Sequence, residues 1–187
     1  VATDPLAVNG KTTDGSLHID ATNLASLPGL PRETLDQVKP SATIIVRSFD
    51  YKAGAQPQGE VIVSDLSAQA PGVGPVTGGQ LTATVAGGGA KVDIAQLKLL
   101  GGIVKGRLES KTLSAASPQL SGHLDLAGLG YHQDEYRAGF DGAVDLGPAA
   151  GQDSAGGLTV AVTGKLTAGR QGQQPFESPL AAGATLF

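Results

Sequence analysis

Gly122-His123-Leu124-Asp125-Leu126 and Gly142-Ala143-Val144-Asp145-Leu146 share one pattern: a glycine followed two and four residues later by an apolar side chain. The two stretches start 20 residues apart, and the pattern recurs at steps of 20 to 23 residues along most of the chain. The glycines that begin it are Gly59, Gly79, Gly102, Gly122, Gly142 and Gly164. A fixed period of this length predicts stacked β units rather than a compact enzyme built around one pocket.

The composition of the 187-residue chain predicts a β protein with a thin core. Apolar residues make up 40% of the sequence, but aromatic residues only 4%, and Trp, Met and Cys are absent. Aromatic side chains bury the largest areas, so a core of small aliphatic residues buries comparatively little. The 28 glycines and 11 prolines separate β-prone runs, which is typical of turns in a folded chain.

Charge and cysteine content exclude several classes of function. The formal net charge is −4, and the 13 Lys and Arg residues are scattered along the chain. Nucleic-acid binding needs a concentrated basic surface, so the sequence argues against it. The absence of cysteine excludes disulfides, thiol catalysis and thiolate zinc sites. The sequence shows no secretory leader and no apolar run near the ~18 residues that a membrane-spanning helix needs. This predicts a soluble body. Any membrane anchor of the native protein is expected outside this sequence.

Alternating apolar and polar residues predict an all-β fold with one short helix near the N-terminus. We expect a single domain over residues 1–187, in which residues 1–40 hold one strand and a helical turn at 31–38, opened by Pro31, and residues 41–187 form a meander. The alternation predicts about nine strands in a mostly antiparallel sheet with one apolar and one wet face. The expected strands span residues 16–20, 42–51, 58–68, 80–85, 90–99, 103–110, 119–127, 140–146 and 157–167.

Two local features of this meander can be predicted in more detail. The run Gly87-Gly88-Gly89 favours a hairpin turn, because glycine tolerates the positive φ angles that tight hairpins require. In the strand that follows, the apolar positions shift from even numbers, such as Ile94, to odd numbers, such as Leu97. A one-residue slip would turn the apolar side to water, so we expect a β-bulge near Ala95 and Gln96.

The sequence holds no recognisable catalytic or metal-binding constellation. His18 and His123 fall at outward positions of alternating strands, where a solvated histidine is the simplest interpretation. Single carboxylates at Asp65, Asp93, Asp125, Asp141 and Asp145 are interpreted in the same way. No metal-ligand spacing, phosphate-binding loop or nucleophile elbow is present, so we expect no cofactor, no metal and no enzymatic activity.

One polar segment is the best candidate for a contact with a partner protein. Residues 130–137 are predicted to form a polar loop that gathers two rings, an imidazole and two carboxylates. A plain hairpin loop and a partner-binding loop both fit this composition. The residues of the candidate partner loop are Tyr131, His132, Asp134, Glu135 and Tyr136.

Two stretches give the chain a likeness to known families. The string from Leu97 to Leu108, with its Gly101-Gly102-Ile103-Val104-Lys105-Gly106 turn and strand, and the strand that follows Pro118 resemble the repeat of the AsmA-like envelope proteins of the AsmA/TamB type. Residues 40–102 are similar to the type II secretion system protein N, through Phe49 and Tyr51 at a strand end and the connection Gly72-Val73-Gly74-Pro75.

The first resemblance implies a curved sheet folded into an open, taco-like groove in the bacterial periplasm, with an interior that binds acyl chains. It implies a non-enzymatic module for phospholipid transport between membranes or for envelope biogenesis, with a phospholipid or another lipid as partner. The second implies a periplasmic secretion component that binds proteins. The apolar side chains expected to line the groove are Ile44, Val46, Val61, Val63, Leu81, Val85, Val104, Leu108, Leu124, Leu126, Val144 and Leu146.

Overall fold

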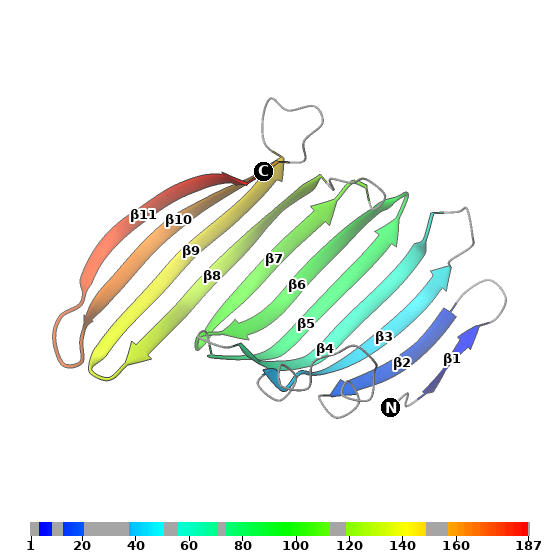
Figure 1. Ribbon diagram of the computed structural model, residues 1–187, viewed down its shortest axis with the longest axis horizontal. Coiled ribbons are helices and arrows are strands. Elements are labelled where there is room, and N and C mark those ends of the chain that lie inside the picture. Colours follow the sequence, from blue (N-terminus) through cyan, green and yellow to red (C-terminus); the bar gives the residue numbers. More distant parts are fainter. Residues whose placement is uncertain are drawn as a thin grey trace.

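All strands of the chain belong to one antiparallel sheet in a computed structural model, which describes residues 4–8, 13–20, 38–50, 56–70, 74–112, 119–148 and 157–186. Neighbours in the sequence are neighbours in the sheet, in the order β1 to β11 (Figure 1). The strands are β1 Asp4–Val8, β2 Thr13–Asp20, β3 Ser41–Asp50, β4 Gln58–Ala70, β5 Gly74–Ala86, β6 Gly89–Leu99, β7 Gly102–Ser110, β8 Leu120–Gln133, β9 Tyr136–Pro148, β10 Leu158–Arg170 and β11 Phe176–Leu186.

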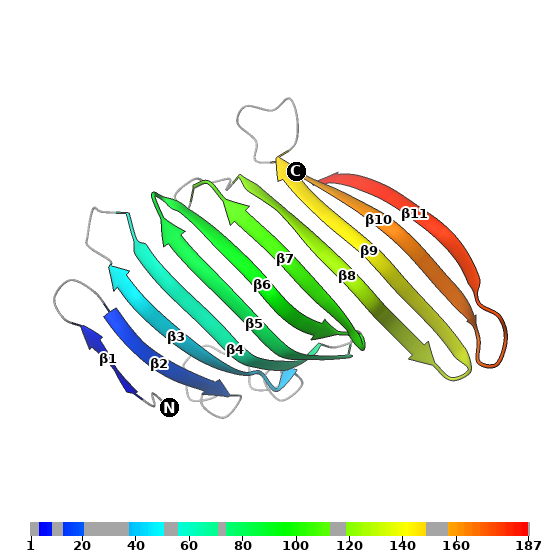
Figure 2. The same cartoon turned by 180° about the vertical axis from the view of Figure 1, so that it is seen from behind.

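The sheet is an open, curved single layer. Its strands bow along their length, and β1 and β11 form its two edges (Figure 1). Seen from behind, no other described element covers it (Figure 2). Only two apolar side chains in the described ranges are buried, Ala42 and Val104. A sheet packed against a second layer would bury a full set of inward side chains, so the described residues form no conventional core.

The all-β class and the antiparallel meander are confirmed, but the predicted number of strands was too low. β2 to β10 correspond to the nine expected strands, whereas β1 and β11 were not expected. The predicted helix at residues 31–38 lies, apart from Val38, outside the described residues. The predicted loop at 130–137 is wrong: β8 and β9 run through this segment and leave a turn of only Asp134 and Glu135.

The two detailed local predictions are confirmed. Gly87 and Gly88 form the turn between β5 and β6, with φ angles of 59° and 79°. The register between β6 and β7 shifts between Ile94 and Leu97, which is the expected β-bulge. The bulge restores the phase of the apolar side chains, because it adds one residue to β6 without turning the strand over.

Candidate functional site

The register of the sheet places the apolar side chains of consecutive strands on one side. Cross-strand partners in an antiparallel sheet point to the same face. One continuous row of partners from β3 to β11 comprises Ile44, Val63, Leu81, Ile94, Gly106, Leu124, Val144, Val162 and Ala182. The row beside it comprises Val46, Val61, Ala83, Val92, Leu108, Gly122, Leu146, Val160 and Ala184. We call this side of the sheet the apolar face and the opposite side the polar face.

The structure brings all twelve predicted groove residues together on the apolar face. Nine of them lie in the two rows above, and Val85 lies two residues after Ala83 on the same side of β5. Val104 and Leu126 are direct partners of each other between β7 and β8. Apart from Val104, these side chains are only partly buried. The predicted set is therefore one contiguous surface that no described element covers.

The repeat glycines also lie on the apolar face, and several lie beneath side chains from elsewhere on that face. A Cβ added at Gly59 would lie 2.7 Å from Phe49 Cδ2, and one at Gly79 would lie 2.9 Å from Leu66 Cβ. Cβ atoms at Gly142 and Gly164 would lie 2.7 and 2.8 Å from Phe140 Cζ. The ring of Phe140 thus lies across a pair of glycines that face each other between β9 and β10. Large side chains can lie flat on the sheet at these places, because glycine leaves the space open.

One end of the apolar face carries large exposed apolar side chains, of which the sequence interpretation named Tyr131 and Tyr136 only as loop residues. The large hydrophobic residues exposed in the described part of the chain are Tyr131, Tyr136, Leu166, Phe176 and Leu180. The register places all five on the apolar face of β8 to β11. Phe176 is 69% exposed and Tyr136 is 57% exposed. If the alternation had been extended back from Phe140 to Tyr136, it would have predicted that Tyr136 lies on the apolar face.

The candidate partner residues lie at this same end, in the β8–β9 turn and in the strand ends beside it. Glu135 forms an ion pair with Arg170, and its carbonyl accepts a 2.7 Å hydrogen bond from the Gln171 N–H. The guanidinium of Arg170 also lies 5.5 Å from the centre of the Tyr136 ring. These contacts tie the β8–β9 turn to the β10–β11 turn. Tyr131 and Tyr136 face the apolar side, whereas His132 faces the polar side opposite Arg137.

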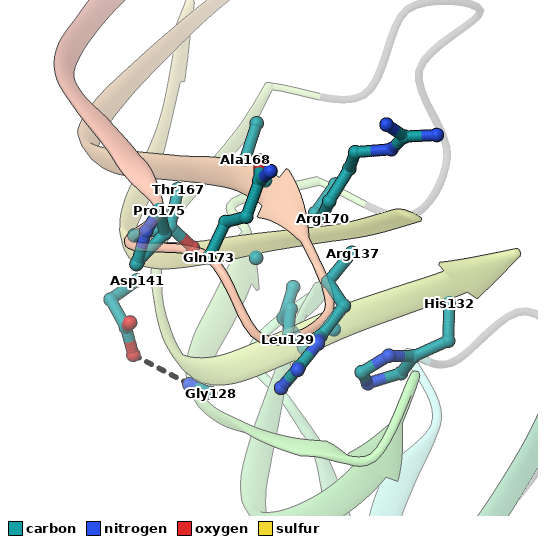
Figure 3. A pocket seen from close by; sticks show the side chains of 14 residues that line it. Gly128, Leu129, His132, Arg137, Asp141, Thr167, Ala168, Arg170, Gln173 and Pro175 are labelled. Atoms are coloured by element: carbon teal, nitrogen blue, oxygen red, sulfur yellow. Dashed lines mark hydrogen bonds between the residues drawn. The ribbon is translucent and has the colours of Figure 1, made fainter. Parts of the chain in front are cut away.

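A shallow polar hollow lies beside this turn. It has a volume of about 340 Å³, and Gly130 and Gly139 are among the residues that line it. His132 and Arg137 line it as well (Figure 3). The Asp141 carboxylate lines it too and accepts a 2.6 Å hydrogen bond from the Gly128 N–H (Figure 3). Its charged side chains differ from the aliphatic lining that an acyl chain needs. The hollow is therefore a poor candidate for the acyl-chain site.

Charged side chains of the polar face form ladders across the strands. Arg107 Nε donates a 2.6 Å hydrogen bond to Asp93, and Lys91 Nζ lies 3.3 Å from the same carboxylate. The hydrogen bond from Arg107 is the main reason why the pKa of Asp93 is lowered. Lys165 and Glu177 pair at 2.6 Å between β10 and β11. Such exposed pairs contribute little individually, but they keep this face solvated.

His123 on the polar face contacts two carboxylates. Its Nδ1 lies 2.6 Å from an Asp145 carboxylate oxygen, and its Nε2 lies 3.3 Å from an Asp125 oxygen. The hydrogen bond with Asp145, followed by that with Asp125, raises the pKa of the imidazole. The sequence interpretation placed all three residues at the solvent face but did not pair them. In the described ranges, no group of three or more histidine and acidic side chains could hold a metal ion.

Comparisons with protein-family models, with curated proteins and with solved structures found no match to this chain. The likeness to the AsmA-like proteins and to the secretion protein therefore stays a prediction. Among the described residues, no helix is both long and apolar enough to cross a membrane. The strongest candidate site is the uncovered apolar face itself.

Proposed function

We propose that this chain is a non-enzymatic β-groove module of the bacterial periplasm that binds the acyl chains of phospholipids on its apolar face. One observation carries this proposal. Two rows of aliphatic side chains, each interrupted by one glycine, cross nine strands, yet only Ala42 and Val104 are buried among the described apolar residues. A large contiguous apolar patch on a soluble protein marks a binding surface.

The composition of the face suits an acyl chain better than it suits a folded partner. Protein interfaces are enriched in aromatic residues and arginine at their centres. The middle of this face is instead built from Val, Leu, Ile, Ala and Gly. Burial of an acyl chain on such a surface is worth about 0.8 kcal/mol per methylene group, without any directional contact. The charged ladders all lie on the other side of the sheet, so they do not compete for the same surface.

The resemblance to AsmA-like proteins supports the same function and adds a place for it. In that setting the module holds phospholipid during transport between membranes or during envelope biogenesis. A curved sheet closed lengthwise around the lipid is the finer form of this proposal. The exposed rings of Tyr131, Tyr136 and Phe176 would then mark the end of the groove where a lipid enters.

Two neighbouring residues of β10 provide a matched test. Val162 points to the apolar face, whereas Thr163 points to the polar face, where Ala143 and Ala181 are its partners. We expect protein purified from bacterial cells to carry phospholipid in native mass spectrometry. Val162→Asp should lose most of it, because a carboxylate on the face repels the acyl chain, while Thr163→Asp should retain it.

The same experiment can contradict the proposal. Circular dichroism of both variants establishes whether each keeps its β structure. A wild-type chain without lipid would count against the proposal, as would equal lipid loss in two folded variants.

The second candidate function is that of a type II secretion accessory that binds proteins in the periplasm. The long, exposed edge strand β11 favours it, since extended segments can add to a sheet edge. In this case a fragment of a secretion channel should bind the lipid-free chain, and Val162→Asp should leave the binding unchanged. Failure to bind any such fragment leaves the lipid proposal as the better one.

A further inference from the structure

The outer edge of β11 is free of any partner in the described sheet. β11 pairs with β10 over eleven consecutive residue pairs, from Phe176 to Leu186, without a register shift. Its residues from 179 to 185 are exposed. An exposed edge strand presents unpaired N–H and C=O groups, which form a template for another strand.

Pro179 fixes which backbone groups of β11 point outward. A proline has no N–H, so within a continuous ladder it must sit where the N–H would face away from the neighbouring strand. The ladder with β10 passes through the Lys165–Pro179 pair without a shift. In an antiparallel strand the outward positions alternate, so Ala181, Gly183 and Thr185 also direct their N–H and C=O groups outward.

The outward positions divide β11 into a blocked part and an open part. Toward the start of the strand, Pro179 lacks a donor, and Glu177 places a charge that is paired with Lys165. Proline and charge are the features that protect natural edge strands from pairing. Residues 181–185 have neither, and their outward positions carry only small side chains or none. The open part is therefore the only stretch of β11 that combines free donors with an unobstructed edge.

We propose that residues 181–185 of two copies of this chain pair antiparallel about a two-fold axis at Gly183. In this register Gly183 faces Gly183 of the second copy, and Ala181 faces Thr185. Three facing pairs of this kind exchange about six backbone hydrogen bonds. A two-fold axis perpendicular to the sheet keeps like faces together, so the two apolar faces form one surface.

A second copy fits this edge because the segment is complementary to itself. No charged side chain lies within residues 181–185, so no like charges face each other across the axis. On the apolar side Ala182 faces Ala184 of the second copy, which continues the rows that cross the sheet. The opposite edge offers no equal site, since β1 has five residues and its register with β2 is irregular.

A cysteine introduced on the axis tests the register directly. The chain contains no cysteine, so Gly183→Cys introduces a single thiol. Facing residues of a hydrogen-bonded antiparallel pair have Cα atoms about 5.5 Å apart, within the range of a disulfide. Ser178→Cys is the control in the same strand, since its two copies would be about 33 Å apart at 3.3 Å per residue. Under mild oxidation we expect nearly complete dimer from Gly183→Cys and little from Ser178→Cys.

Proline and alanine substitutions of Gly183 distinguish a loss of pairing between two copies from a loss of folding. Gly183→Pro removes an outward donor while keeping the inward bonds to β10, and Gly183→Ala keeps the donor. A Cβ at this position meets only Val160 O, at 3.7 Å, so alanine fits. In sedimentation equilibrium we expect wild type and Gly183→Ala at twice the 18.6 kDa monomer mass. We expect Gly183→Pro as a folded monomer by circular dichroism.

Several results would overturn the pairing. These are a monomeric wild type, a dimer that persists in Gly183→Pro, or equal crosslinking of Gly183→Cys and Ser178→Cys. None of them depends on whether lipid is bound, so this proposal and the lipid proposal can fail independently.

Discussion

Glycine residues have two effects on the packing of the apolar face. They let neighbouring strands approach closely, and they give the large side chains of other residues a place to lie. Gly142 shows both, because an added Cβ would lie 2.2 Å from the Thr163 carbonyl oxygen and 2.7 Å from the Phe140 ring. A face assembled in this way is shallow, because its largest side chains lie along the sheet. This explains why a glycine repeat accompanies a sheet without a second layer.

Two glycines of β9 allow this interpretation to be tested. We expect Gly142→Ala to lower the free energy of unfolding by about 1–3 kcal/mol, because the methyl group has no room and the neighbouring strand must shift. Gly147→Ala is the matched control, since nothing lies within 4 Å of its Cβ. It should be neutral or stabilising by less than about 1 kcal/mol. Urea unfolding of the two variants measures the difference, and equal values for both would contradict the close packing at Gly142.

His123 makes the stability of the sheet depend on pH. Its carboxylate partners Asp145 and Asp125 raise the pKa of the folded imidazole above the usual value of about 6.5. The stabilisation from the charged form is therefore complete below the unfolded pKa and is lost as the pH rises through the folded pKa. We expect the melting temperature to fall as the pH rises from below about 6.5 through the raised folded pKa, and to fall less in His123→Gln.

The control for this pH effect is a histidine of the same strand. His132→Gln changes an exposed histidine that lies opposite Arg137 in the register of β8 and β9. It should therefore retain the wild-type fall in melting temperature. If His123→Gln and His132→Gln change the pH profile equally, the ion pairs of His123 with Asp145 and Asp125 contribute nothing to it.

At the scale of elements, turn residues and side-chain alternation made β2 to β10 predictable. Alternation failed where proline or polar residues interrupted it. β1 contains Pro5 and β11 contains Pro179, and proline normally argues against a strand. β11 forms nevertheless, since Pro179 faces outward on an edge. The segment 130–137 was mistaken for a loop because most of its residues are polar and only its two tyrosines follow the apolar alternation.

The β5–β6 hairpin offers a prediction about its turn. Gly87 has a φ of 59° and nothing within 4 Å of its Cβ, so only backbone conformation limits a substitution there. Asparagine tolerates this conformation, whereas a β-branched residue does not. We expect Gly87→Val to destabilise the protein by about 1–2 kcal/mol more than Gly87→Asn in urea unfolding. Equal stability of the two variants would mean that the turn adopts another conformation.

For the whole molecule, alternation was enough to predict which residues share the apolar face, because β-strand periodicity decides the side of each residue. It could not predict which polar residues meet, such as His123 and Asp145, because such pairs depend on the register between strands. Alternation extended back from Phe140 could have placed Tyr136 on this face, but the gathering of exposed aromatic residues at one end depends on β8, β9, β10 and β11 lying side by side. The alternation within each strand therefore predicts which side of the sheet a residue faces, whereas the register between strands decides which residues contact one another.

The openness of the sheet gives a quantitative expectation for ligands. If acyl chains bind along rows of aliphatic side chains, each added methylene finds more apolar surface of the same kind. A gain of about 0.8 kcal/mol per methylene corresponds to a roughly fourfold fall in Kd for each carbon added. Titration calorimetry with saturated fatty acids of increasing length, below their micellar concentrations, measures this slope. Val162→Asp should weaken binding throughout the series, and Thr163→Asp should leave it unchanged. A Kd independent of chain length would mean that the ligands bind through their carboxylates, and the apolar face would then not be the acyl-chain site.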